Sequence, residues 1–132
     1  MIPAVFVNCS KHPFIDLIMA RRKPFETRTR NTLGRFLGDT ILFAETGHGK
    51  PLARCYAKIV EIIEVFTREE WEKYREAACI PADSDFDWKP WTRKKVLYRL
   101  DEVVAIDPFR ITDGIRHGRV WMEYEGKEER TG

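Results

Sequence analysis

Short apolar runs bounded by turn residues recur along the chain and predict more strands than helices. β-branched and aromatic residues dominate these runs, as is typical of a pleated, half-buried surface. Gly38 and Asp39 supply a turn between two of the runs. The predicted strands are residues 4–7, 25–29, 40–44, 52–65, 96–100, 103–106 and 120–124.

Two segments have a helical pattern instead. The first follows Ser10, a suitable N-cap, and ends before Pro24, because the residue before a proline disfavours helical geometry. The second begins at Thr67, which can form a capping box with Glu70. Together these elements predict a mainly β protein of the α+β class, a small, mostly antiparallel barrel with two or more decorating helices.

The segment between the second helix and the next strand has no clear period. Residues 79–95 contain two prolines and three large aromatic side chains, which predicts an irregular insertion or flap and not a linker. The charged residues 125–132 are expected to fray. Because 132 residues is a typical length for one domain, we expect residues 1–132 to form a single domain.

The composition is that of a protein that folds in water. The 132 residues are 43% hydrophobic and 33% charged, and no apolar run approaches the ~20 residues of a membrane helix. The first residues lack the basic-then-apolar order of a secretory signal, and the three cysteines include no C-x-x-C pair. We therefore expect a cytoplasmic protein with reduced thiols and no membrane partner.

Positive charge is concentrated around the second predicted strand. Six cations and one acid lie between Arg21 and Arg35, in a chain whose net charge is only +2. A small net charge argues against indiscriminate coating of nucleic acid, which depends on many phosphate contacts. One acid within a basic cluster instead indicates a defined cleft for an anion or a nucleobase.

Strand alternation assigns the faces of this segment. Successive side chains point to opposite faces, so Glu26, Arg28 and Arg30 share one side, and Thr27 points the other way, into the core. Glu26 would accept hydrogen bonds from the amino or imino edge of a base, and Arg28 would bind a phosphate or carbonyl group. The alternative is a Glu26–Arg28 ion pair on a solvated barrel rim, which contributes little energy. The candidate ligand-binding residues are Lys23, Glu26, Arg28 and Arg30.

A second basic segment, residues 88–95, interleaves aromatic side chains with cations. Aromatic faces next to Lys or Arg suit unpaired bases, where each stacked base contributes about 1–3 kcal/mol. Trp91, Arg93 and Lys94 are therefore candidate nucleic-acid-binding residues. The alternative is that the tryptophans pin the flap to the barrel.

The sequence contains no complete motif for binding a metal ion or a phosphate. The three histidines lack the spacing of a zinc site, and residues 47–50 lack the first glycine and the following Ser or Thr of a phosphate loop. Residues 83–94 lack the glycine and glutamate that a calcium loop requires at its sixth and twelfth places. We predict no metal and no cofactor.

Three motifs in order resemble the ASCH domains of the PUA-like superfamily. They are His-Pro-Phe-Ile-Asp-Leu-Ile at 12–18, Arg-Lys-Pro-Phe-Glu-Thr-Arg at 22–28, and Gly-Asp at 38–39. The resemblance spans roughly residues 5–66 and 95–124. It implies a pseudo-barrel with a cleft around Lys23, Glu26 and Arg28, and a protein that binds RNA or a nucleotide-like small molecule.

The resemblance also implies an enzymatic alternative. Some small ASCH proteins hydrolyse N4-acetylcytidine with a lysine, a threonine three residues later and a distant glutamate. Here Glu26 lies three residues after Lys23, and the threonine comes one place later, at Thr27. The alternatives to a binding domain are therefore a hydrolase of a modified nucleoside or a ribonuclease, with Lys23 and Glu26 as the catalytic candidates, or an interaction domain whose cleft is vestigial.

Overall fold

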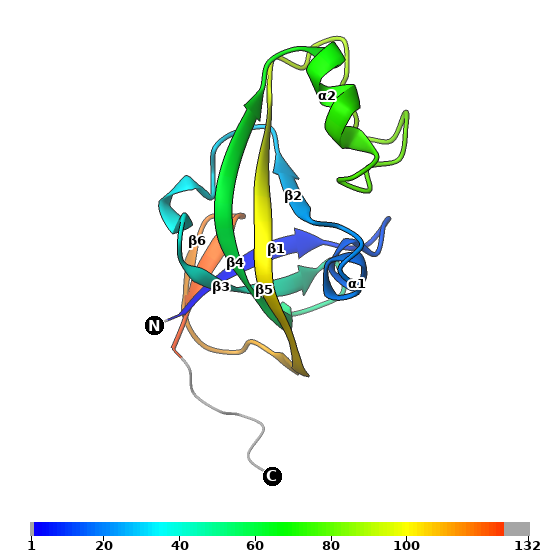
Figure 1. Cartoon of the computed structure of the whole chain (residues 1–132). Coiled ribbons are helices and arrows are strands. Elements are labelled where there is room, and N and C mark those ends of the chain that lie inside the picture. The colour runs from blue at the N-terminus through cyan, green and yellow to red at the C-terminus, as the bar shows by residue number, and fades with distance from the viewer. Residues whose placement is uncertain (1, 126–132) are drawn as a thin grey trace.

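Seven strands form one continuous sheet that curls into a half-barrel (Figure 1). The structure is a computed structural model and describes residues 2–125. The strands are β1 (Ile2–Asn8), β2 (Phe25–Arg28), β3 (Thr40–Thr46), β4 (Leu52–Val65), β5 (Lys95–Arg110), β6 (Ile115–His117) and β7 (Trp121–Tyr124). The helices are α1 (Phe14–Met19), α2 (Arg68–Arg75) and the short 3-10 helix η1 (Gly34–Phe36).

The strands are arranged in the order β2-β5-β4-β3-β1-β7-β6. Neighbouring strands are antiparallel, except that β1 and β3 run parallel. This confirms the predicted mainly β class and the mixed barrel with decorating helices. Among residues 2–125, no helix has the length and the apolar character that crossing a membrane requires.

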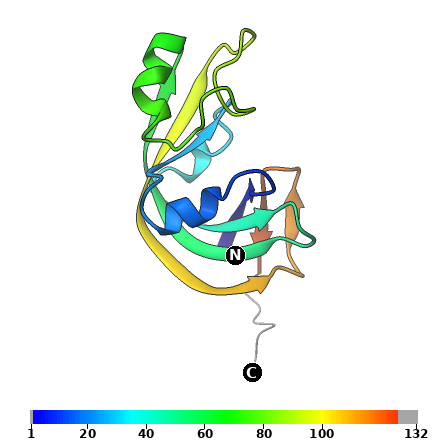
Figure 2. The same cartoon turned by 90° about the vertical axis from the view of Figure 1, so that its right-hand side faces the viewer.

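A long hairpin of β4 and β5 gives the molecule its shape. The pairing runs from Leu52 opposite Arg110 to Val65 opposite Lys95, and it is interrupted by three shifts of register. Such bulges bend a strand and increase its twist. One half of the hairpin therefore curves into the half-barrel, and the other half projects beyond it toward α2 (Figures 1 and 2).

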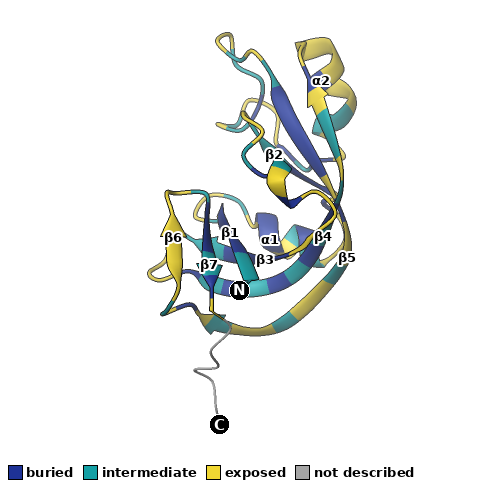
Figure 3. Cartoon of the chain, turned by 90° about the vertical axis from the view of Figure 1, so that its left-hand side faces the viewer, coloured by how far each residue is buried: buried dark blue, intermediate teal, exposed yellow. Residues whose placement is uncertain are grey.

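The central strands are buried on both faces. In β1, Val5 and Val7 join the main core with α1, while Ala4 and Phe6 join a second, smaller cluster on the opposite face. Strand alternation explains this division, because neighbouring side chains leave the strand on opposite sides. Within the sheet, exposed residues are concentrated on β6 and along the second half of β5 (Figure 3).

The helices α1 and α2 differ in how their N-termini are capped. In α2, Thr67 Oγ1 accepts a hydrogen bond from Glu70 N at 3.1 Å and Phe66 N donates to Glu70 Oε1 at 3.4 Å, which confirms the predicted capping box. In contrast, α1 begins after Pro13 and has no side-chain cap, so the prediction of Ser10 as its N-cap is wrong.

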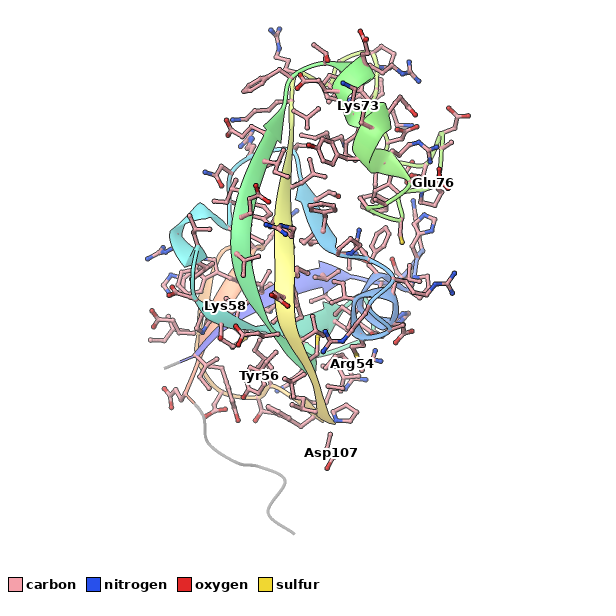
Figure 4. The ribbon with its side chains drawn as sticks, in the orientation of Figure 1. Arg54, Tyr56, Lys58, Lys73, Glu76 and Asp107 are labelled. Carbon is pink, nitrogen blue, oxygen red and sulfur yellow. The ribbon has the colours of Figure 1, made fainter. Side chains whose placement is uncertain are left out.

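An ion-pair cluster ties α1 to the sheet. Arg54 on β4 bonds Asp16 of α1 at 2.6 Å and also bonds Glu45 of β3. The Arg54 side chain, with Tyr56 and Lys58 further along β4, lies in the half-barrel, well away from Lys73 and Glu76 at α2 (Figure 4). The first turn of α1 is thereby fixed relative to β3 and β4.

Two strand predictions need correction. Residues 95–110 form one strand instead of the two predicted at 96–100 and 103–106, because β4 is long enough to pair with the whole segment. The strand β6 was not predicted. Its three residues are all exposed, so they show no alternation between a buried and an exposed face. The predicted frayed tail falls mainly on residues 126–132, which lie outside the described part of the chain.

Residues 76–94, from here on called the flap, contain neither helix nor strand and connect α2 to β5. Its anchor is the buried carboxylate of Asp87, which accepts hydrogen bonds from Trp71 Nε1 at 2.7 Å, from Asp83 N at 2.8 Å and from Trp88 N at 2.7 Å. Although burial opposes ionisation, these hydrogen bonds lower the pKa of Asp87 below its usual value. The flap is therefore fastened to α2 and not a free linker.

We expect Asp87→Ala to lower the free energy of unfolding by about 3 kcal/mol, because three donors lose their acceptor and at least one is buried. Since the pKa of Asp87 is lowered by folding, its contribution should persist above about pH 4 and decline at more acidic pH. Urea unfolding at pH 7 and pH 3 measures both effects. The control is Asp85→Ala, which removes an exposed flap carboxylate paired with Lys11 and should cost far less, because solvent screens an exposed ion pair. Equal losses in the two variants would contradict the anchoring role.

Candidate functional site

A cavity of about 270 Å³ lies where β1, the start of α1, β2, the flap and the first residue of β5 meet. Both charged and aromatic side chains line it, which is the usual character of a small-ligand site. The lining residues are Phe6, Val7, Asn8, Phe14, Lys23, Glu26, Thr27, Arg28, Thr29, Asp85, Phe86 and Lys95.

Lys23 is the most deeply buried charged group in this wall, with 1% of its surface exposed. Its Nζ donates a hydrogen bond to the carbonyl oxygen of Ala78 in the flap at 2.6 Å and lies 4.7 Å from the centre of the Phe14 ring. Within the described part of the chain, no carboxylate forms an ion pair with it. Burial lowers the pKa of Lys23, an effect that nearby Glu26 partly opposes.

Glu26 and Arg28 lie side by side at the edge strand of the sheet. Glu26 is 5% exposed, and its Oε2 is 2.8 Å from Nη2 of Arg28. The same nitrogen donates to the carbonyl oxygen of Phe6 in β1 at 2.8 Å. Nε of Arg28 is buried and has no hydrogen-bond partner among residues 2–125. The pair is thus fixed in orientation, and one donor of its guanidinium remains unused.

Tyr98 of β5 fixes the loop that follows β2. Its hydroxyl accepts a hydrogen bond from Leu33 N at 3.1 Å and donates one to Asn31 Oδ1 at 2.8 Å. Tyr98 is opposite Glu26 in the register of β2 with β5. Burial raises the pKa of this hydroxyl. The hydroxyl therefore remains a neutral donor. Tyr98 positions both strand β2, through its pairing with Glu26, and the loop that follows Arg28.

The flap closes the other side of the cavity. The Phe86 ring packs edge-on against Phe14, with ring centres 5.1 Å apart, and Asp85 on the rim pairs with Lys11 at 2.6 Å. Lys95 is 5% exposed, and its Nζ donates to the carbonyl oxygen of Phe86 at 2.9 Å. Two buried lysines, one on each side, thus hold flap carbonyls beside the cavity.

The structure brings together three of the candidate residues. Lys23, Glu26 and Arg28 line the cavity, whereas Arg30 is exposed and lies outside its wall. Alternation predicts that Thr27 points into the core. In the structure it is half-buried and lines the cavity.

The second basic segment forms a separate surface. Trp91 is 76% exposed, Arg93 is exposed, and Lys94 pairs with Glu64 across the hairpin at 3.3 Å; none of the three lines the cavity. Trp88 is half-buried and packs against the main core. In the described residues, no three His, Cys, Asp or Glu side chains are grouped so as to hold a metal ion.

Sequence reasoning missed Lys95 and Phe86 as parts of the site. Lys95 belongs to the basic segment that alternation could not place, because its burial depends on how the flap folds back over β5. Phe86 lies in the irregular part of the flap. No periodic pattern marks either residue, since tertiary packing alone brings them to the cavity.

A model of the ASCH domain family matches residues 10–110. The chain belongs to the ASCH domain family. This ASCH domain also resembles a crystal structure of ASCH from Zymomonas mobilis, with a TM-score of 0.65 and 19% identity over 82% of this chain and 73% of that chain. Because the identity is low, this likeness bears on the fold alone.

Two crystal structures of variants of the Zymomonas mobilis protein give similar values. A serine-to-alanine variant matches with a TM-score of 0.67 and 20% identity, over 81% of this chain and 73% of that chain. A tyrosine-to-phenylalanine variant matches with a TM-score of 0.67 and 20% identity, over 82% and 76%. No curated protein matches this chain.

The buried lysine of the site should make stability depend on pH. Because burial lowers the pKa of Lys23 below 10.5, the unfolded state binds more protons than the folded state in the window below that value, and stability rises with pH there. We therefore expect the difference in free energy of unfolding between the wild type and Lys23→Met to shift in favour of the wild type from about pH 8 to pH 10.5. Chemical denaturation across this range measures the difference.

The matched control for this experiment is Lys73→Met, which removes an exposed lysine of α2 (Figure 4). Its difference from the wild type should stay constant over the same range. A constant difference for Lys23→Met as well would show that the ammonium of Lys23 is not destabilised by burial.

Proposed function

We propose that this ASCH domain binds RNA or another nucleobase-containing ligand in the cavity around Lys23, Glu26 and Arg28. The observation that carries the proposal is a carboxylate held in one orientation beside cations at an open cavity. A carboxylate is an acceptor only, so it suits the amino and imino donors on the edge of a base. Arg28 adds donors that suit a carbonyl oxygen or a phosphate.

The size and lining of the cavity agree with one unpaired base. Its volume of about 270 Å³ is slightly below the roughly 300–1,000 Å³ that ligand sites typically enclose. Phe14 and Phe86 contribute aromatic surface to its wall. Sequence-specific recognition of RNA commonly uses bases that are splayed out of the stack and held by aromatic and polar side chains. A single nucleotide unit fits this description better than a duplex.

For a longer RNA, we assign the flanking contacts to Trp91, Arg93 and Lys94. An aromatic side chain that is 76% exposed is free to stack on a base, and the neighbouring cations can contact phosphates. This surface lies outside the cavity, so it would affect the binding of a strand and not of a single nucleoside.

A hydrolase of a modified nucleoside is the second candidate. Burial lowers the pKa of Lys23, which favours its neutral, proton-accepting form, and Glu26 lies in the same wall. Thr27 lines the same cavity. The same lysine and glutamate would serve a ribonuclease.

Glu26→Gln tests whether the ligand binds at the Glu26 carboxylate. The amide keeps the shape of the side chain but loses the charge, so we expect the affinity for nucleosides or short RNAs to fall about tenfold or more, as for a hydrogen bond to a charged group. Isothermal titration calorimetry against the four ribonucleosides and a mixed-sequence oligoribonucleotide measures the change. The control is Glu61→Gln, which changes an exposed carboxylate on β4 that pairs with Arg99. Unchanged affinity in Glu26→Gln would contradict the proposed site.

Lys23→Ala separates a binding domain from an enzyme. Retained binding with loss of turnover of N4-acetylcytidine, or of RNA cleavage, would assign the chain to the enzymes. Weaker, salt-sensitive binding with no turnover in the wild type would assign it to the binding domains. Chromatography of the reaction products, run beside the calorimetry, measures turnover.

Trp91→Ala tests the flanking surface. We expect it to weaken the binding of an oligoribonucleotide by about 5- to 100-fold, the loss of one stacked base, and to leave the binding of a nucleoside unchanged. Phe66→Ala is the control, because Phe66 is also an exposed aromatic residue, with 57% of its surface accessible. Equal effects of the two substitutions would remove Trp91 from the RNA-binding surface.

A further inference from the structure

Lys95 has a place in the cavity that its position in the chain does not explain. It is the first residue of β5, directly after the flap, and it is 5% exposed although its neighbours Arg93 and Lys94 remain at the surface. We infer that Lys95 binds an anionic group of the ligand, the phosphate of a nucleotide, and so makes the cavity prefer phosphorylated over unphosphorylated nucleosides. This inference rests on the proposed function and assigns a substrate class to the same site.

The ammonium group of Lys95 has unused capacity. Its Nζ donates to one acceptor, the carbonyl oxygen of Phe86 at 2.9 Å, and lies 5.3 Å from the centre of the Trp71 ring. A lysine ammonium has three N–H donors, so this one hydrogen bond among residues 2–125 leaves two for another partner. Both Lys95 and Phe86 line the cavity, so a ligand there would lie next to this side chain.

The neighbouring carboxylate does not neutralise Lys95. Asp87 is the acidic group whose charge acts on it, but the Asp87 oxygens already accept hydrogen bonds from Trp71, Asp83 and Trp88. Within residues 2–125, Lys95 takes part in no ion pair. Burial accordingly lowers its pKa, with Asp87 opposing and Lys89 adding to the shift. A bound anion would offset the cost of burying the charged ammonium of Lys95.

The charges around the cavity favour the same class of ligand. Lys23, Arg28 and Lys95 face one inner carboxylate, Glu26, because Asp85 on the rim is already paired with Lys11. A buried excess of positive charge is costly unless an anion compensates it. Arg28 is paired with Glu26 through Nη2, whereas Lys95, on the flap side, has no ion-pair partner among residues 2–125.

The competing explanation is that Lys95 only supports the flap through the Phe86 carbonyl. The two roles differ in one measurable quantity, the ratio of affinities for a nucleoside 5′-monophosphate and the same nucleoside. A support that shapes the cavity alters both affinities together and leaves the ratio unchanged. An anion-binding residue alters the ratio.

The experiment measures this ratio by calorimetry for the wild type, Lys95→Met and Lys73→Met, with the four ribonucleosides, their 5′-monophosphates and the dinucleotide CpU. Methionine keeps the approximate length and the apolar stem of lysine, and Lys73→Met removes the same charge from an exposed lysine of α2 that lies outside the cavity. We expect the wild type to bind at least one monophosphate about tenfold or more tightly than its nucleoside, as for a hydrogen bond to a charged group. Lys95→Met should remove this preference, and Lys73→Met should keep it.

Each other result is informative. A wild type that binds nucleosides and monophosphates equally overturns the inference, whatever the variants do, and leaves the proposed function intact. Equal loss of the preference in Lys73→Met also overturns it, because the effect would then come from overall charge. A wild type that binds none of the probes overturns the proposed function and this inference with it. Binding of CpU at least as tight as that of the monophosphates would identify the anion as an RNA phosphodiester.

Discussion

The first five residues of β5 are the constraint on which the site depends. They pair with β2 on one side and with the end of β4 on the other: Val96 is opposite Arg28, Tyr98 opposite Glu26, and Lys95 opposite Val65. This register brings the charged face of β2 to the base of the flap. It also places the Tyr98 hydroxyl under the loop after β2. The short strand β2 has no other partner in the described sheet, so its charged residues depend on β5 for their position.

Buried charge distinguishes this cavity from an ordinary gap in a barrel. Four polar or charged side chains are buried in the described residues, and three of them, Lys23, Glu26 and Lys95, line the cavity. The fourth, Asp87, shows how a structural charge is treated, since three N–H groups surround its carboxylate. Each of the two lysines instead has one carbonyl acceptor and an aromatic ring, and their pKa values are lowered by burial. Incomplete pairing of this kind is common where a ligand completes the set of partners.

The sequence indicated the part of the site that local geometry controls. Alternation along an extended chain was enough to group Glu26 with Arg28, and the ordered motifs were enough to indicate an ASCH domain, which the family match confirms. Long-range packing decides the rest. Lys95 is buried only because the flap folds over it, β6 is fully exposed and has no apolar pattern, and Thr27 lines the cavity because a short edge strand is open on one side. Arg30 shares a face with Arg28 in an ideal strand, but β2 ends at Arg28, so alternation no longer applies to it.

An amide-resolved NMR titration with ribonucleosides and their monophosphates tests the location of binding most directly. If the cavity is the site, the largest shifts will fall on residues 23–29, on Phe86 and on Lys95, and will saturate together. A second cavity of about 230 Å³, lined in part by Lys50, Asp113 and Arg116, provides an internal comparison. Shifts confined to that second cavity, or no saturable shifts at either place, would contradict a nucleobase site at the Glu26–Arg28 pair.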